Sequence, residues 1–471
     1  MRTYDSIASD LSAGKTSCET ITQEYLRAIE EGGELNAFLA VFPDHALDQA
    51  RAVDRKLASG GAGSLAGMVV AIKDVICVKD QKVTCGSKIL QNFVSLYDAT
   101  AVVRLREADA IIIGKTNMDE FAMGSSTENS AFGRVSLPQD RTRVPGGSSG
   151  GSAVAVRAGM STASLGSDTG GSIRQPASFT GVVGLKPTYG RVSRYGLVAF
   201  ASSFDTIGPF ALAAKDIARV LYVIAGHDER DSTSAAIPVP DYVATLTKDI
   251  KGLRVGIPKE YFGEGLNSEV RDAIEKRIDV LRANGAIITD VSLPHTEYTI
   301  AAYYILVTAE ASSNLARYDG ARYGYRAKKT ADLPIMYTRS RSEGFGPEVK
   351  RRIMLGTYVL SAGYYDAYYR KGQKVRRLIQ EDFVNAFTKV DCLITPTSPT
   401  TAFKAGEKVD DPLQMYLSDI YTTSANLAGI PGISIPCGQD HQGLPIGLQI
   451  LGRQFDESTI LKVADFLETA A

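Results

Sequence analysis

Two clusters of glycine and serine hold the side chains of this 471-residue chain that could carry out nucleophilic chemistry. They are PGGSSGGSAVAV at 145–156 and SDTGGSIRQPAS at 167–178. Ser172 follows a Thr-Gly-Gly turn in the second cluster, and consecutive backbone N–H groups of a glycine turn can point into one concavity. The N–H groups that could do so beside the Ser172 hydroxyl belong to Thr169, Gly170 and Gly171. A nucleophile next to an oxyanion-binding nest is what the cleavage of an amide requires.

A serine hydroxyl is a weak nucleophile unless a base accepts its proton, and the sequence favours lysine as that base. The four histidines stand far apart, at His45, His227, His295 and His441. Lys73 lies in MVVAIKD (68–74), a β-branched apolar run typical of a buried strand. A desolvated lysine loses its preference for the charged form and can act as a base. Taken alone, a strand lysine is more often one whose ammonium reaches the surface.

Other candidate sites are weaker. Ser149 and Ser152 are rival nucleophiles, but the packing of small residues in a helix explains them better. Gly114-Lys115-Thr116 resembles the end of a phosphate-binding loop, yet the glycine that this motif needs five residues earlier is Asp109. Gly61-Ala-Gly63 follows a polar helix rather than a strand, so a dinucleotide site is not indicated there.

The elements that must position these residues alternate between helix and strand. Helical periodicity predicts helices at 17–31, 44–59, 268–284, 296–318 and 346–388 and a closing helix at the C-terminus. Apolar runs predict strands at 68–74, 110–114, 252–258, 286–294, 391–397, 431–438 and 444–452. This pattern predicts an α/β fold, a single large domain with a mixed β-sheet core covered by helices on both faces.

The composition of the chain restricts the partners and the cellular compartment that we expect for it. The net charge of −1 gives the whole molecule no signature of a nucleic-acid or membrane binder. Five scattered cysteines predict neither disulfides nor a metal site, and with no apolar leader at the start they favour the cytoplasm. Residues 317–377 hold fifteen Lys and Arg against five Asp and Glu, with many tyrosines. We expect either solvated helix faces whose tyrosines pack inward or a surface that faces a partner or RNA.

The two glycine–serine clusters, in this order and after a strand lysine, resemble the amidase signature family over about residues 65–210. The resemblance implies a Ser–Ser–Lys triad in place of Ser–His–Asp. Ser172 would attack the amide carbonyl, and Ser148 would pass the proton to neutral Lys73. It also implies a cis peptide between Gly147 and Ser148.

Flanking segments resemble one branch of that family, the A subunits of glutamyl-tRNA(Gln) and aspartyl-tRNA(Asn) amidotransferases. They lie at 115–133, 193–210, 310–324, 341–353 and 362–369. The resemblance implies one amidase signature domain over 1–471, divided into N-terminal helices (1–60), the catalytic core (65–210) and a remainder that forms the substrate pocket (215–471).

That resemblance also implies a function. A glutaminase would release ammonia, which a partner uses to convert Glu-tRNA(Gln) to Gln-tRNA(Gln), with Asp-tRNA(Asn) left open as a second acceptor. ATP and Mg²⁺ are expected at that partner, the B subunit, with a small C subunit completing a heterotrimer that binds tRNA; this chain itself would hold no cofactor or metal. In the glutamine pocket, Arg352 would face the α-carboxylate, Asp419 the α-ammonium, and Tyr303 or its neighbour Tyr304 would complete the site.

Two alternatives remain open at this point. A free-standing amidase that hydrolyses small or fatty amides would use the same triad without needing the pair Arg352 and Asp419. A scaffold without activity would keep the fold, but the intact Lys73, Ser148 and Ser172 argue against it.

Overall fold

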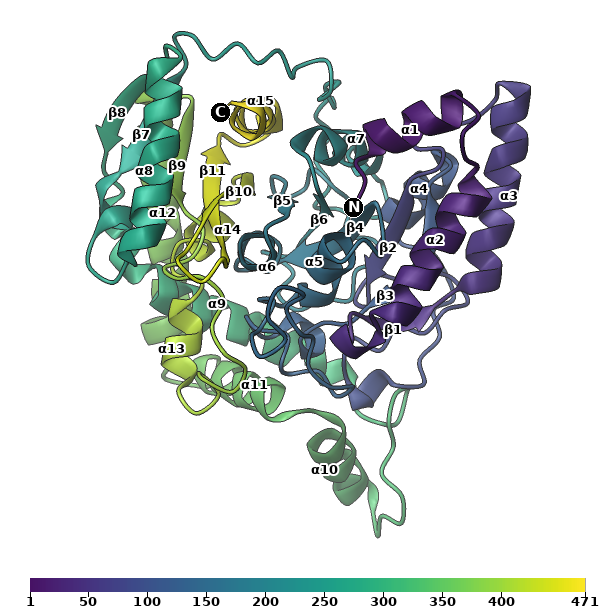
Figure 1. The fold of residues 1–471 in the computed structure, drawn as a ribbon. Coiled ribbons are helices and arrows are strands. Elements are labelled where there is room, and N and C mark those ends of the chain that lie inside the picture. The colour runs from purple at the N-terminus through teal and green to yellow at the C-terminus, as the bar shows by residue number, and fades with distance from the viewer. Residues whose placement is uncertain (471) are drawn as a thin grey trace.

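A single mixed sheet runs through the protein (Figure 1). The structure, a computed structural model, describes residues 1–470. Within that range the sheet has eleven strands in the order β1-β3-β2-β4-β6-β5-β10-β11-β9-β7-β8. Their bounds are β1 Phe38–Val41, β2 Val69–Lys73, β3 Ile111–Thr116, β4 Ala163–Asp168, β5 Val183–Lys186, β6 Thr206–Ala211, β7 Arg254–Pro258, β8 Ile287–Val291, β9 Cys392–Pro396, β10 Gly432–Gln439 and β11 Pro445–Gly452.

Parallel pairing is confined to two parts of the sheet. Strand β2 lies between β3 and β4 and is parallel to both, and β7 lies between β8 and β9 and is parallel to both. The pairs that join these two parts through β6, β5, β10 and β11 are antiparallel. Parallel strands that are buried on both faces consist of nearly continuous apolar residues. The β2 and β3 segments could be recognised in the sequence for this reason.

Helices and helical turns connect the strands. The α-helices are α1 Tyr4–Ser12, α2 Cys18–Glu31, α3 Pro43–Ser59, α4 Thr100–Glu107, α5 Gly150–Arg157, α6 Arg174–Thr180, α7 Ala214–Ile224, α8 Ser268–Ala283, α9 Thr299–Asn314, α10 Leu333–Gly344, α11 Pro347–Val359, α12 Lys371–Lys389, α13 Pro412–Leu417, α14 Thr423–Ala428 and α15 Glu457–Thr469. Short helical turns are η1 Gly33–Leu35, η2 Lys88–Leu90, η3 Glu120–Ala122, η4 Lys259–Phe262, η5 Pro294–Tyr298, η6 Leu315–Arg317 and η7 Tyr365–Arg370.

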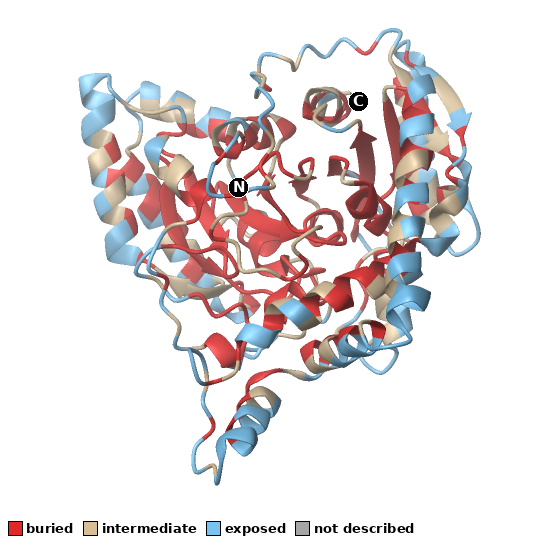
Figure 2. Cartoon of the chain, turned by 180° about the vertical axis from the view of Figure 1, so that it is seen from behind, coloured by how far each residue is buried: buried red, intermediate tan, exposed pale blue. Residues whose placement is uncertain are grey.

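Both faces of the sheet are covered, as predicted. Successive side chains of a strand point to opposite faces, and β6 illustrates this. Ile207 and Ala211 join the large core on the face of α7, whereas Phe210 joins a smaller core with α5 and α6 on the other face. Figure 2 shows the central strands and the segments between them buried, with exposed residues concentrated on the outer helices.

The predicted elements are mostly confirmed. Helix α2 begins where predicted because the Ser17 side chain accepts a hydrogen bond from Thr20 N–H at 3.0 Å, which caps the first turn. The helix expected at 346–388 is wrong in its middle: α11 ends at Val359, and a turn that contains Gly363 at φ +85° separates it from η7 and α12. Positive φ favours glycine, and this turn redirects the chain before α12.

The fold also bears on the weaker candidate sites. Lys115 of the P-loop-like tripeptide lies inside β3, fully buried, with Nζ 3.4 Å from Asp74 Oδ1, so no phosphate-binding loop forms. All five cysteines are buried and free. None of the helices in residues 1–470 combines the length and apolar character that a membrane span needs.

Candidate active site

Lys73 is the last residue of β2, and its side chain is completely buried. Its Nζ hydrogen-bonds to Ser148 Oγ at 2.8 Å and to Ser167 Oγ at 2.9 Å. Burial lowers the pKa of Lys73 to about 7, although the charges of Asp119, Asp168 and Asp205 act in the opposite direction. The strand lysine is thus a buried amine with a large neutral fraction near pH 7, and not one that reaches the surface.

Ser148 stands at the start of the segment that leads into α5. The peptide bond between Gly147 and Ser148 is cis, as the family resemblance implied. Gly147 is packed too closely for any side chain, since a Cβ there would lie 2.2 Å from Asp119 Oδ2 and 2.6 Å from the Ser126 backbone nitrogen. The backbone on this side of the site is therefore fixed by its surroundings, with Ser148 facing Lys73.

Ser172 follows β4 and precedes α6, and it alone of the three predicted triad residues has any exposure, 8% against 0% for Lys73 and Ser148. The Ser149 N–H donates to the Ser172 carbonyl at 3.2 Å, which joins the two serine segments. No hydrogen bond joins the hydroxyls of Ser148 and Ser172 within residues 1–470. Catalytic hydrogen bonds often tighten only when substrate binds, so this geometry is compatible with the predicted relay.

The rival serines are engaged in structural contacts. Ser149 Oγ donates to the Ser167 carbonyl at 3.1 Å, and Ser152 Oγ donates to the Leu165 carbonyl at 3.0 Å. Both side chains are completely buried. These contacts attach α5 to β4, in agreement with the interpretation that the small residues of this cluster serve packing.

The backbone around Ser172 is held by Asp168. Its carboxylate accepts the Gly171 N–H at 2.9 Å and the Ile173 N–H at 3.1 Å. The Gly171 N–H is already taken, whereas the N–H groups of Thr169, Gly170 and Ser172 have no hydrogen-bond partner among residues 1–470. The predicted contribution of Gly171 to an oxyanion hole therefore conflicts with this geometry, whereas the free N–H groups of Thr169 and Gly170 are compatible with it, and their role stays a prediction.

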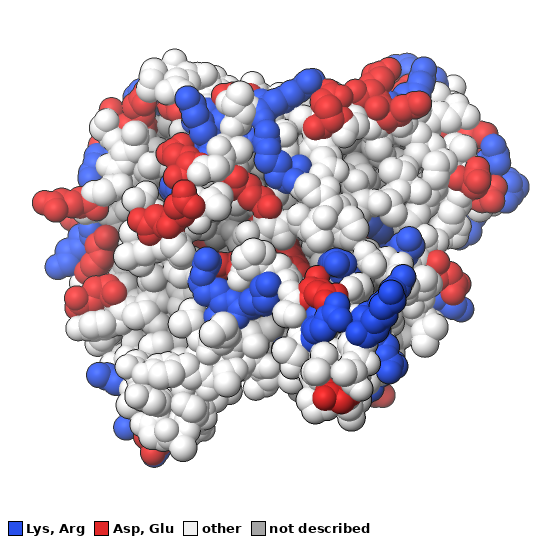
Figure 3. Space-filling view, turned by 90° about the horizontal axis from the view of Figure 1, so that it is seen from below, with Lys and Arg blue, Asp and Glu red and all other residues white. Residues whose placement is uncertain are grey.

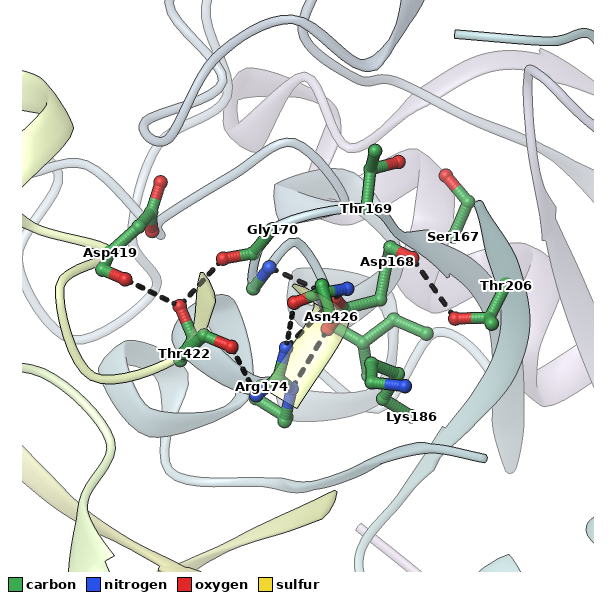
Figure 4. Close-up of polar contacts among 12 residues, drawn as sticks. Ser167, Asp168, Thr169, Gly170, Arg174, Lys186, Thr206, Asp419, Thr422 and Asn426 are labelled. Atoms are coloured by element: carbon green, nitrogen blue, oxygen red, sulfur yellow. Dashed lines mark hydrogen bonds and ion pairs between the residues drawn. The ribbon is translucent and has the colours of Figure 1, made fainter. Parts of the chain in front are cut away.

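A buried network, which the sequence reasoning missed, anchors this aspartate (Figure 4). Arg174 makes two hydrogen bonds to Asp168, at 3.0 and 3.1 Å, and Asn426 Nδ2 donates a third at 2.9 Å. Although burial favours the neutral form, Arg174 holds the pKa of Asp168 at about 2. The only available sequence signal was an Asp and an Arg on either side of the Gly-Gly-Ser turn; the contribution of Asn426 comes from a distant segment.

The predicted substrate residue Asp419 lies on the loop before α14 and is buried. Ser125 Oγ donates to Asp419 Oδ2, but Oδ1 has no hydrogen-bond partner among the described residues. Burial raises the pKa of Asp419 to about 7. A buried carboxylate oxygen without a partner is unfavourable unless a donor such as a substrate ammonium group arrives.

Arg352 of α11 is also buried, among the rings of Phe200, Tyr304 and Tyr416 with centroids 5.2 to 5.6 Å from its guanidinium carbon. Its Nε donates to Glu348 Oε1 at 2.8 Å, one turn earlier on the helix, a partner that the sequence reasoning did not name. The two Nη atoms make no hydrogen bond within residues 1–470. Arg352, Glu348 and Tyr416 line a cavity of about 140 Å³.

The two adjacent tyrosines of α9 lie in different places. Tyr303 faces the nucleophile turn so closely that a Cβ on Gly170 would lie 2.3 Å from its hydroxyl oxygen. Tyr304 stacks on Tyr416 with ring centroids 3.8 Å apart, beside Arg352. Tyr303 is thus the one positioned next to the reacting centre, and Tyr304 belongs to the aromatic cage of the arginine.

The arrangement can bind a small amide that carries both charges and attack its carbonyl. It brings a buried amine, two serines and an N–H nest together at the carboxyl ends of β2 and β4, places Tyr303 against the same turn and links Asp419 to it through Thr422. No cluster of three or more His, Cys, Asp or Glu side chains suited to a metal ion occurs within residues 1–470.

Comparisons with known proteins agree with this geometry. A sequence model of the Amidase family matches residues 20–461. The A subunit of the glutamyl-tRNA(Gln) amidotransferase of Koribacter versatilis is 58% identical over 470 residues, which covers 99% of this chain and 98% of that protein.

Solved structures give the same result. The crystal structure of the A subunit of the glutamyl-tRNA(Gln) amidotransferase from Thermotoga maritima is 42% identical with a TM-score of 0.81 and covers 96% of this chain and 92% of that one. The native peptide amidase from Stenotrophomonas maltophilia, 32% identical, also has a TM-score of 0.81 and covers 98% and 95%. The resemblance drawn from the glycine–serine clusters is confirmed: this chain belongs to the Amidase family.

Proposed function

We propose that this chain is the glutaminase component of a tRNA-dependent amidotransferase in the cytoplasm. It hydrolyses glutamine to glutamate and ammonia. A partner, with ATP and Mg²⁺ bound there, uses the ammonia to convert Glu-tRNA(Gln) to Gln-tRNA(Gln), and Asp-tRNA(Asn) is a second candidate acceptor. The partners are the B subunit, which holds tRNA and ATP, and the small C subunit. The names of the similar proteins from Koribacter and Thermotoga support this assignment.

One observation supports glutamine as the substrate more than any other. Asp419 has a buried carboxylate with Oδ1 unpartnered, and its backbone is joined to the nucleophile turn, because Thr422 Oγ1 lies within hydrogen-bonding distance of both Asp419 O and Gly170 O. An α-ammonium group at Asp419 and an α-carboxylate at Arg352 would hold the side-chain amide of glutamine near Ser172. A small or fatty amide without these charges would leave the carboxylate unpaired, which disfavours the free-standing amidase.

The chemistry follows from the positions of the three side chains. Neutral Lys73 accepts the proton of Ser148, and Ser148 accepts that of Ser172 as Ser172 Oγ bonds to the amide carbon. The N–H groups of Gly170 and Ser172 stabilise the resulting oxyanion. The relayed proton returns to the leaving nitrogen, ammonia departs, and water then hydrolyses the glutamyl ester by the same relay. One amide bond is exchanged for an ester bond and then for a carboxylate, with no redox change.

The test is Ser172→Ala in the assembled amidotransferase. We expect glutamine hydrolysis to disappear, since loss of a catalytic nucleophile costs several orders of magnitude in rate. Amidation of the charged tRNA from added ammonium should continue, which controls for folding and assembly. Ser149→Ala is a matched control in the first cluster, because its hydroxyl contacts the Ser167 carbonyl and not the base. Glutamine hydrolysis by Ser172→Ala would overturn the assignment of the nucleophile.

A further inference from the structure

Thr422, directly before α14, connects the glutamine-binding loop to the nucleophile turn. Its hydroxyl lies 2.7 Å from the Gly170 carbonyl and 3.0 Å from the Asp419 carbonyl and is oriented to donate to either. Figure 4 shows Thr422 between the two residues. The side chain is completely buried. One hydroxyl proton therefore serves two carbonyls, one from the substrate-binding loop and one from the catalytic turn.

The contact is close enough to require a glycine on the other side. A Cβ on Gly171 would lie 2.2 Å from Thr422 Oγ1, and Gly171 has φ +136°. The Thr422 carbonyl is also fixed, because it accepts a hydrogen bond from Arg174 Nη1 at 2.9 Å. Thr422 is thus attached to the catalytic turn through its hydroxyl. Its carbonyl attaches it to Arg174, whose side chain also binds Asp168.

These contacts fix one peptide unit at both ends. The unit between Gly170 and Gly171 has its oxygen held by Thr422 and its N–H held by Asp168 Oδ1 at 2.9 Å. A planar peptide held at both ends cannot rotate. The neighbouring peptide units carry the N–H groups of Gly170 and Ser172, so the orientation of both oxyanion donors depends on the unit that Thr422 holds.

We propose that Thr422 is a positioning residue that orients the oxyanion-binding N–H groups of Gly170 and Ser172 and ties their orientation to the loop that carries Asp419. The inference rests on the proposed glutaminase function. Thr422 acts on the transition state through the turn, without contact with the reacting atoms, so its loss lowers kcat with little change in KM.

Thr422→Val tests this, since valine keeps the shape and removes the hydroxyl. In the assembled complex we expect kcat for glutamine hydrolysis to fall at least about tenfold and KM to stay within about threefold, because a displaced oxyanion donor loses part of the ~100- to 1,000-fold that such a donor contributes. Thr422→Ser keeps the hydroxyl and should restore kcat to within about threefold of the parent value. The pH at which kcat is half-maximal should be the same in all variants, since Lys73 and Ser148 are unchanged.

Thr423→Val is the matched control. Thr423 is the next residue and completely buried, but its hydroxyl has no hydrogen-bond partner within residues 1–470. Replacing an unpartnered buried hydroxyl by a methyl group of the same shape is close to neutral or stabilising. We therefore expect Thr423→Val to keep kcat, KM and thermal stability.

Each result with the Thr422 variants either supports the proposal or contradicts it. A kcat for Thr422→Val equal to that of the parent protein would overturn it, and so would a Thr422→Ser variant as impaired as Thr422→Val, which would assign the effect to packing of the methyl group. If Thr422→Val does not fold, Thr422→Cys, whose thiol donates only weakly, should have an intermediate kcat; a parental kcat would again overturn the proposal. Failure of the proposed function gives a different result, because the parent complex itself would then not hydrolyse glutamine.

Discussion

At the scale of single residues, the site contains a lysine that is in large part neutral near pH 7 because it is buried. Burial of Lys73 against Ser148 and Ser167 lowers its pKa, and the carboxylates of Asp119, Asp168 and Asp205 limit that decrease. In the proposed mechanism the base therefore has a pKa near neutral pH although it is not a histidine. Burial at the end of β2 disfavours the protonated form of Lys73, so the low pKa of this lysine follows from its position in the fold.

The pKa of Lys73 predicts the direction in which kcat changes with pH. Protonated Lys73 cannot accept the proton from Ser148, and its pKa is about 7, so kcat should rise with pH through neutrality and level off above it. Between pH 6 and pH 8 the neutral fraction changes roughly tenfold, and kcat should follow. Measuring kcat at saturating glutamine separates this titration from that of Asp419, whose pKa is also about 7 but which should act on substrate binding.

The control for this measurement is Lys73→Arg, which keeps a positive charge over the whole range and should lack glutaminase activity at every pH. A kcat that is independent of pH between 6 and 8, or one that falls as pH rises, would contradict the role of Lys73 as the base.

Residue identities could be predicted from sequence where the motif is contiguous. The order of Lys73, Ser148 and Ser172 and the cis peptide followed from the family resemblance that the two clusters carry, and the structure brings Lys73 and Ser148 together as expected. The partners of these residues could not be predicted, because they come from segments far away in the chain. Asn426 reaches Asp168 from 258 residues further on, and no local pattern marks an asparagine in a short helix as part of the site.

At the scale of elements, the catalytic turn between β4 and α6 is determined by what surrounds it. Gly170 is packed against Tyr303 of α9, Gly171 against Thr422 before α14, and Asp168 holds the N–H groups on both sides of Ser172. On sequence grounds, an N–H nest explains the glycines of this turn. The structure adds a second reason, the close approach of the backbone to side chains from two other elements.

Gly171→Ala should therefore be damaging. The substitution adds a Cβ 2.2 Å from Thr422 Oγ1 at a residue with φ +136°. Such backbone strain alone costs about 1–3 kcal/mol, and the overlap adds to it. We expect a lower free energy of unfolding in urea and loss of glutaminase activity in the protein that does fold, since the overlap displaces the turn that carries Ser172.

Gly14→Ala provides the comparison. Gly14 also has a positive φ, +63°, but a Cβ there would meet nothing within 4 Å. Its destabilisation should be limited to the conformational cost, about 1 kcal/mol, with activity unchanged. Equal losses of stability in the two variants would show that the contact with Thr422 has no energetic effect.

The sequence predicted elements well where periodicity was regular and less well where tertiary contacts decide the boundaries. Strands β2, β3, β7 and β9 lie within or close to the predicted runs, because each is a short apolar segment. The long helix expected at 346–388 is divided instead, since α11 packs against α9 while η7 and α12 follow after a turn. The break falls at Gly363, and because a single glycine can also occur inside a helix, this residue alone did not mark the break in the sequence.

At the scale of the whole molecule, the basic, tyrosine-rich stretch 317–377 is distinct from the rest of the surface. Of the two alternatives expected for this stretch, the one in which its tyrosines pack inward does not hold for Tyr358, Tyr364, Tyr365 and Tyr368, which are exposed. On the face seen from below, Lys and Arg alternate with Asp and Glu and do not form one continuous basic surface (Figure 3). With a net charge of −1 for the chain, this favours a protein partner over RNA for the stretch.

The exposed apolar side chains in this stretch support the same conclusion. Met354 is 73% exposed on α11, with Leu355 beside it, and the tyrosines of the following turn and η7 lie next in the chain. Tyrosine, methionine and arginine are the side chains enriched at protein interfaces, and clustered exposed apolar residues indicate an interaction surface. We therefore expect residues 347–370 to be covered when the other components of the amidotransferase bind.

Hydrogen exchange of the chain alone and in the complex tests this expectation. Amides of residues 347–370 should exchange more slowly in the complex, because helix ends that fray in solution are held when their apolar side chains are buried. Tyr365→Ala and Met354→Asp should weaken assembly, whereas Asp366→Asn, an exposed neighbour of Tyr365, removes only an i,i+4 surface ion pair with Arg370 and should leave it nearly unchanged. Equal exchange with and without the partners would place the interface elsewhere and return this stretch to a solvated helical face.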